Sequence, residues 1–288
     1  MDVGPANIVE VTPDTVVPII ANPRPAATVV LLRDSLRGPE VFLVRRHEGT
    51  PFMGGAHVFP GGRVDAADSD GHAAWCDGDA SADHVAAARE LFEEAGVLLA
   101  RGAGRRFVAL ADVATQDRFK RYQHQVHDGT VSLRTIVESE GLRLAADALI
   151  FFSHWVTPPI DTRQFDTRFF LTRVPPEQTP VHDDTETTHS TWLSPTAAIL
   201  QARDGVIVLP PPTWVTVREL ERFATVDGAL DWARRRHVVR RQPLLIEDAG
   251  TRTLVMPGDP LHPDADGGEP GIETRFVSID RGWRAEHA

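Results

Sequence analysis

Apolar residues follow two different patterns along the chain, and together these patterns predict an α/β fold. Short apolar or alternating runs predict strands at 26–32, 41–46, 56–59, 150–156, 165–174 and 187–192. Apolar residues at helical spacing predict helices at 81–95, 110–147, 195–202, 213–224 and 226–236. Strands interspersed with amphipathic helices are typical of a sheet that is covered by helices.

The helix predicted over 81–95 concentrates negative charge on one side. Glu90, Glu93 and Glu94 share one face, about 100° wide, because a helix turns about 100° per residue. The apolar residues of the segment lie on the opposite face. Like charges at this spacing destabilise a helix by about a few tenths of a kcal/mol per pair, so a divalent cation would offset their repulsion. A solvated acidic surface is the alternative interpretation.

A glycine turn precedes the acidic helix. Gly61 and Gly62 follow the extended stretch 56–59 and a proline. Glycine lets the backbone approach a ligand or another strand closely, and the exposed carbonyls of such a turn can bind a hard cation.

The overall charge limits the classes of partner. The formal net charge is −11, which makes broad electrostatic binding to nucleic acid or to an anionic membrane unlikely. A phosphorylated substrate remains compatible, because a bound metal and local arginines can reverse the sign at one site. A lone cysteine, Cys76, and the lack of a long apolar run lead us to expect a reducing, cytoplasmic location and no membrane span.

The turn and the helix together resemble the signature of the Nudix hydrolase family, which reads Gly, five residues, Glu, seven residues, Arg-Glu-aliphatic-x-Glu-Glu-x-Gly-aliphatic. Gly62 matches the first glycine and 89–97 matches the second half, whereas Asp68 stands in place of the first Glu. Residues 69–88 form a longer spacer than usual. The lead-in 55–65 resembles the branch of peroxisomal-type coenzyme A diphosphatases, which tolerates such an insertion.

The resemblance implies the Nudix α/β/α sandwich with a mixed sheet, together with a helical insertion and a C-terminal helical extension. We expect an N-terminal arm at 1–25, a Nudix hydrolase domain at 26–202 and an extension at 203–288 that packs on it. Within the domain, a helical insertion at about 110–147 is expected to form a lid or flank that shapes specificity.

The resemblance also implies metal-dependent hydrolysis of the pyrophosphate bond in a nucleoside diphosphate linked to another group. The matching branch favours coenzyme A (CoA) or acyl-CoA, cleaved to 3′,5′-ADP and a 4′-phosphopantetheine. Alternatives within the family are hydrolysis of ADP-ribose, NADH, dinucleoside polyphosphates or RNA caps. A non-catalytic nucleotide sensor is an alternative of another class, although three mutually repelling acids favour an enzyme.

The family motif implies roles for the acidic residues. Glu93 and Glu94 are expected to be chiefly ligands of Mg²⁺ or Mn²⁺, with the carbonyl of Gly62 beside them, and Glu90 is expected to be a ligand or the general base. Arg89 is expected to orient these carboxylates.

A late acidic loop at 175–188 is expected to supply a further ligand or the base. Glu186 is the first choice there and Asp184 the second.

Substrate contacts are expected from residues at strand ends and in the glycine turn, namely Arg45, His57, Gly61, Arg163 and Arg168. Arginine suits phosphate because it donates two parallel hydrogen bonds, but a charged strand face explains these arginines equally well. The expected partner is a small nucleotide, and a homodimer is suggested by family analogy alone.

Overall fold

The structure is a computed structural model that describes residues 23–50, 53–69, 71–158, 164–183, 185–279 and 282–287. Most of the expected N-terminal arm, together with Arg163 and Asp184, lies outside the described residues.

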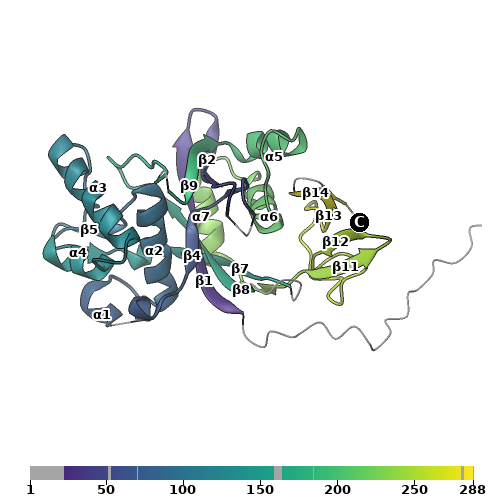
Figure 1. Ribbon diagram of the computed structural model, residues 1–288, viewed down its shortest axis with the longest axis horizontal. Helices are drawn as coiled ribbons and strands as arrows, with labels where there is room; N and C mark the ends of the chain where they lie inside the picture. Colours follow the sequence, from purple (N-terminus) through teal and green to yellow (C-terminus); the bar gives the residue numbers. More distant parts are fainter. Residues whose placement is uncertain are drawn as a thin grey trace, which may run out of the picture.

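A mixed sheet forms the centre of the molecule (Figure 1). Its path runs β10-β7-β8-β1-β2-β3, with β4 paired to β1 and β9 paired to β2. The strands are β1 (Arg24–Ser35), β2 (Gly38–Arg46), β3 (His57–Val58), β4 (Gly61–Arg63), β7 (Ile150–Val156), β8 (Phe165–Arg173), β9 (Thr187–Leu193) and β10 (Arg240–Arg241). The β1–β8 and β10–β7 pairs are parallel, and the other pairs are antiparallel.

Strand β1 is buried on both faces of this sheet. Because successive side chains point to opposite faces, Val29 and Leu31 belong to one apolar core, whereas Val30 and Leu32 belong to the other. All four side chains are fully buried. This two-sided burial explains why the run is continuously apolar instead of alternating.

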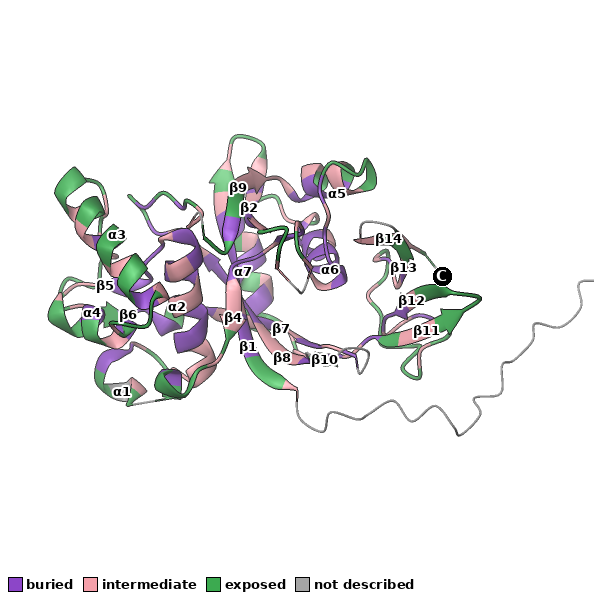
Figure 2. Cartoon of the chain, in the orientation of Figure 1, coloured by how far each residue is buried: buried purple, intermediate pink, exposed green. Residues whose placement is uncertain are grey.

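Helices cover both faces, so the molecule has three layers (Figures 1 and 2). One core contains residues of α2 (Ala82–Ala95), α3 (Val113–His127) and α4 (Leu133–Ser139). The other core contains residues of α5 (Pro195–Arg203), α6 (Pro211–Leu220) and α7 (Val226–Arg235). The predicted α/β/α sandwich is therefore confirmed.

The long spacer before the acidic helix is folded. A 3₁₀ turn at Ala66–Ser69 leads into it, and it contains the short helix α1 (His72–Trp75). Trp75 is buried against the core that contains α2. After α2, the pair β5 (Ala100–Arg101) and β6 (Arg143–Leu144) brackets α3 and α4, and a 3₁₀ turn at Ala146–Ala148 leads into β7.

The C-terminal extension was expected to be helical, but only its first part, α6 and α7, is helical, and it continues as a four-stranded antiparallel sheet. Its strands are β11 (Leu244–Asp248), β12 (Thr251–Val255), β13 (Arg275–Ile279) and β14 (Gly282–Glu286). Pro211 and Pro212 form the first turn of α6. Proline suits this position because the first helical residues need no N–H donor.

None of the helices in the described ranges combines the length and the apolar character that a bilayer-spanning helix needs.

Candidate functional site

The acidic helix α2 ends beside the glycine turn, as the motif predicts. Gly96 terminates α2 in the left-handed conformation, with φ of 65°, which glycine adopts without strain. Glu94 faces inward and is only 5% exposed. Its Oε2 accepts a hydrogen bond of 3.0 Å from the backbone N–H of Gly61. Helix and turn are therefore joined through a buried carboxylate.

The glycine turn has no room for side chains. Gly61 and Gly62 pair with Thr28 and Ala27 in the β4–β1 ladder. A Cβ at Gly61 would lie 2.5 Å from the carbonyl oxygen of Ala27, and one at Gly62 would lie 2.3 Å from Oε1 of Glu90. Only glycine lets the strand and the carboxylate approach this closely.

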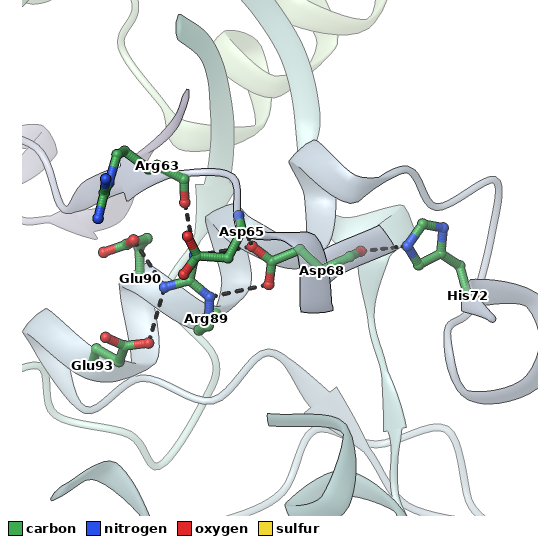
Figure 3. Close-up of polar contacts among 7 residues, drawn as sticks. All are labelled: Arg63, Asp65, Asp68, His72, Arg89, Glu90 and Glu93. Atoms are coloured by element: carbon green, nitrogen blue, oxygen red, sulfur yellow. Dashed lines mark hydrogen bonds and ion pairs between the residues drawn. The ribbon is translucent and has the colours of Figure 1, made fainter. Parts of the chain in front are cut away.

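Arg89 holds several carboxylates at once (Figure 3). Its guanidinium donates to Glu90 Oε1 at 2.9 Å and to Glu93 Oε1 at 3.0 Å. It also binds Asp68 at two points, each 3.0 Å long, and donates to the carbonyl of Arg63 at 2.8 Å. The side chain of Asp68 is 3% exposed. Arg89 thus fixes the positions of Glu90 and Glu93, while Asp68 fixes Arg89.

Burial makes the acidic cluster electrostatically unfavourable when it is not neutralised. Burial, with a contribution from Glu93, raises the pKa of Glu90 to about 7 against the stabilising charge of Arg89. Burial also raises the pKa of Glu93, and it raises the pKa of Glu94 well above its usual range, with the charge of Glu90 adding to the shift. Glu186 raises the pKa of all three, so this loop residue lies within their electrostatic reach.

The donor set fits a hard divalent cation. Within the described residues, no group of three His, Cys, Asp or Glu side chains converges on one point. Arg89 holds two of the glutamates, Glu90 and Glu93. The cluster nevertheless offers carboxylate oxygens beside the carbonyls of a tight turn, which are the ligands that Mg²⁺ and related ions prefer. Its mutually repelling, partly buried acids are also what a cation would neutralise.

A cavity of about 740 Å³ opens on the acidic cluster. One wall carries the acids and the glycine turn, with Glu90, Glu93 and Glu186 facing the space. The opposite side is largely apolar and comes from β7, β8, the start of α6 and the C-terminal sheet, through Trp155, Phe165, Phe169, Pro210, Leu254 and Trp283. No residue of α3 or α4 lines this cavity. The helical insertion was expected to form a lid or flank that shapes specificity, but its helices make no part of the cavity wall.

Three of the expected substrate contacts lie away from this cavity. Arg168 pairs with Asp83 at 2.9 Å. Arg45 pairs with Glu48 at 2.7 Å and, together with His57, lines a second cavity of about 940 Å³. Burial, with the nearby charge of Arg45 contributing, lowers the pKa of His57 to about 4, so this imidazole is neutral at pH 7.

Sequence reasoning missed several residues that line the cavity. Arg46, not Arg45, faces it, and Arg46 Nε is buried without a hydrogen-bond partner among the described residues. The pairing of β2 with β9 shifts register between these two residues, so alternation along the strand could not decide between them. Arg252 and Trp283 also line the cavity, and no sequence signal links them to a motif some 150 residues earlier in the chain.

Known proteins resemble this chain in sequence and in fold. The family described as NUDT19 Nudix domain matches residues 77–222. The chain is 30% identical to human acyl-coenzyme A diphosphatase NUDT19, covering 78% of this chain and 72% of the relative. It is 26% identical to putative nudix hydrolase 7 of Caenorhabditis elegans, covering 90% of this chain and 80% of the relative.

A solved structure agrees with the fold. The chain aligns with the crystal structure of a NUDIX hydrolase from Alicyclobacillus acidocaldarius at a TM-score of 0.62 and 25% identity. The alignment covers 73% of this chain and 96% of the chain in the crystal structure. Nudix hydrolases generally use divalent metal ions, in keeping with the donor set described above. The family match and the human relative, together with the acidic helix beside its glycine turn, show that this chain belongs to the Nudix hydrolase family and is a pyrophosphohydrolase of the NUDT19 group.

Proposed function

We propose that this protein hydrolyses the pyrophosphate bond of CoA or of an acyl-CoA and releases 3′,5′-ADP and 4′-phosphopantetheine or its acylated form. The observation that carries the proposal is that one cavity joins the acidic cluster to a largely apolar wall. A volume of about 740 Å³ is within the range of small-molecule sites. Three relatives carry the name acyl-coenzyme A diphosphatase, which supports the same substrate class.

The acids have separable roles in this proposal. Glu93 and Glu94, with the carbonyl of Gly62, would hold Mg²⁺ or Mn²⁺. The bound ion supplies charge neutralisation for the pyrophosphate oxygens. Arg89 keeps Glu93 in place through its 3.0 Å hydrogen bond, and the N–H of Gly61 does the same for Glu94 at 3.0 Å.

A carboxylate that faces the cavity must accept the proton of the attacking water. Glu90 and Glu186 both line the cavity and both remain candidates. Glu90 is held by Arg89 on an α-helix, whereas Glu186 is exposed in the loop before β9. Comparing kcat for Glu90→Gln and Glu186→Gln at saturating metal ion separates them, because loss of the base lowers kcat far more than loss of an outer contact.

The apolar side of the cavity suits the uncharged part of such a substrate. Trp155 is 4% exposed and Phe169 is 6% exposed, so both are fixed by packing. Leu254 and Trp283 complete the same surface from the C-terminal sheet. A pantetheine arm or acyl chain would bury apolar area here, at about 25 cal/mol per Å².

The test is product analysis with CoA, acetyl-CoA, ADP-ribose, NADH and a diadenosine polyphosphate, each with Mg²⁺ or Mn²⁺. The proposal predicts 3′,5′-ADP from the CoA species and faster turnover of these than of the other nucleotides. Preferred cleavage of another nucleotide would overturn the CoA assignment while leaving the pyrophosphohydrolase intact. Tight nucleotide binding without any turnover would favour the sensor alternative.

A further inference from the structure

The C-terminal sheet is fixed to helices α5 and α6 through one buried carboxylate, that of Glu273. Glu273, in the loop before β13, is 2% exposed and accepts hydrogen bonds from three side chains of α5 and α6. These donors are Trp214 Nε1 at 3.1 Å, Arg218 Nε at 3.0 Å and Arg203 Nη2 at 2.9 Å. Breaking a buried pair of this kind is strongly unfavourable. These contacts hold the sheet in a fixed position, where its residues form part of the cavity wall.

One strand of this sheet directs a cation into the cavity that holds the acids. Arg252 and Leu254 lie two residues apart on β12, so they share a face of the sheet. Both line the cavity, as does Trp283 of β14. Arg252 is exposed, and it forms no ion pair with a described residue, although Glu247 lies opposite it in the β11–β12 register.

The other arginines of the cavity are placed differently. Arg89 is occupied by Asp68, Glu90 and Glu93. Arg63 is the last residue of β4, directly after the glycine turn on the wall that carries the acids. Arg46, at the end of β2, lies near the same acids, because its charge acts on Glu94. Arg252 instead comes from the opposite wall, next to Leu254, where the surroundings are mainly apolar. A cation in that position suits a second anionic group that is separated from the reacting pyrophosphate.

We propose that Arg252 is a specificity-determining residue that binds a phosphate of the substrate other than the two that are cleaved apart. This inference rests on the proposed function, since CoA carries such a group as its 3′-phosphate. The guanidinium would donate a pair of hydrogen bonds to the phosphate oxygens, a geometry that arginine provides and glutamine does not. The pantetheine arm has no comparable charge, so it gives Arg252 no partner.

The experiment compares CoA with 3′-dephospho-CoA in wild-type protein, in Arg252→Gln and in a control, Arg284→Gln. Arg284 lies on β14 of the same sheet, pairs with Glu286, is 62% exposed and does not line the cavity. The control therefore removes the same charge from the same sheet at a position outside the site.

We expect the wild-type protein and Arg284→Gln to prefer CoA over 3′-dephospho-CoA by about tenfold or more in kcat/KM, the size of effect that a charged hydrogen bond gives. Arg252→Gln should lower kcat/KM for CoA by a similar factor and leave 3′-dephospho-CoA unchanged, so that the preference disappears. Unchanged turnover of 3′-dephospho-CoA also shows that the variant is folded.

Two outcomes overturn the assignment in distinguishable ways. If Arg252→Gln keeps the wild-type ratio, whether or not both rates fall, Arg252 does not bind the 3′-phosphate and only this inference is lost. If the wild-type protein cleaves neither compound, the proposed function fails, and the assignment of Arg252 fails with it.

Discussion

Asp68 and Arg89 form a two-point ion pair across 21 residues of sequence, with Nε–Oδ1 and Nη2–Oδ2 distances of 3.0 Å each. Asp68 occupies the place of the first glutamate of the family motif, and its carboxylate contacts the arginine of that motif. Arg89 in turn holds Glu90 and Glu93. The Asp68–Arg89 pair therefore positions these two acids, although Asp68 itself does not line the cavity.

Removing the charge of Asp68 should therefore reduce activity through Arg89. Asp68→Asn keeps the shape of the side chain but leaves the half-buried guanidinium with weaker partners. We expect metal affinity or kcat/KM to fall by about 10- to 100-fold, as for other residues that orient metal ligands. Asp79→Asn is the matched control, because Asp79 is an exposed aspartate of the same stretch that does not line the cavity. Equal effects of the two variants would show that the two-point pair has no special role.

Adding one methyl group at Gly62 should displace Glu90. The new Cβ would lie 2.3 Å from Glu90 Oε1, a distance that real Cβ atoms do not adopt. We expect Gly62→Ala to lower kcat/KM by at least about 100-fold, since misplacing catalytic groups by about 1 Å has effects of this size. In the control, Gly104→Ala, the added Cβ meets no atom within 4 Å, and activity should be unchanged. Near wild-type activity of Gly62→Ala would show that Glu90 need not lie against the turn.

Neutralising Glu273 should destabilise the attachment of the C-terminal sheet. Glu273→Gln leaves the buried donors of Arg218 and Trp214 with a neutral acceptor, and we expect a loss of about 3 kcal/mol in the free energy of unfolding. Urea denaturation measures the free energy of unfolding of wild type, of this variant and of a control, Glu247→Gln, in which an exposed glutamate of the same sheet is changed. A loss below about 0.5 kcal/mol would mean that the buried network does not hold the sheet.

The same residue gives a pH dependence of defined sign. Burial alone would raise the pKa of Glu273, but the hydrogen bonds from Trp214 and Arg218 outweigh it and hold the pKa below its usual value of 4.5. A carboxylate with a lowered pKa in the folded state contributes stability above pH 4.5, and this contribution is lost as the pH falls through the folded-state pKa. The stability difference between wild type and Glu273→Gln should therefore shrink below pH 4.5. A difference that stays constant from pH 7 to pH 3 would contradict this explanation.

Cys76 should be chemically inert in the folded protein. The side chain is 3% exposed, and burial raises the pKa of its thiol to about 11. At pH 8 almost no thiolate is present, and the thiolate is the species that reacts. A thiol-specific reagent such as DTNB should label native protein slowly and urea-unfolded protein at once. Rapid stoichiometric labelling of the native protein would show that the spacer containing α1 opens readily.

Sequence patterns predicted the layers of the fold because each core strand and helix carries its own periodic signal. The run 26–32 gave β1, and the apolar side of 81–95 gave the buried face of α2. The acidic cluster and the glycine turn followed from a motif that is local in sequence. The contact between Arg89 and Asp68 could not be predicted in this way, because it depends on how the stretch between the two residues folds, and that stretch has no periodic pattern.

The far side of the cavity could not be predicted for a related reason. Arg252, Leu254 and Trp283 lie on strands of an extension that was expected to be helical, and no sequence pattern shows where these strands pack. The anchoring contacts of Glu273 with α5 and α6 join residues 55–70 positions apart. The choice between Arg45 and Arg46 failed because a register shift in the β2–β9 pair interrupts simple alternation.

The most direct test of the whole account is the metal dependence of CoA hydrolysis in wild-type protein, in Glu93→Gln and in Glu138→Gln. Glu138 is a half-exposed glutamate of α4 that pairs with Arg134 and lies outside the cavity. We predict that wild type and Glu138→Gln release 3′,5′-ADP only with Mg²⁺ or Mn²⁺, that EDTA stops the reaction, and that Glu93→Gln loses at least about 100-fold in kcat/KM. Full metal-dependent turnover by Glu93→Gln would contradict the assignment of the acidic helix as the catalytic metal site.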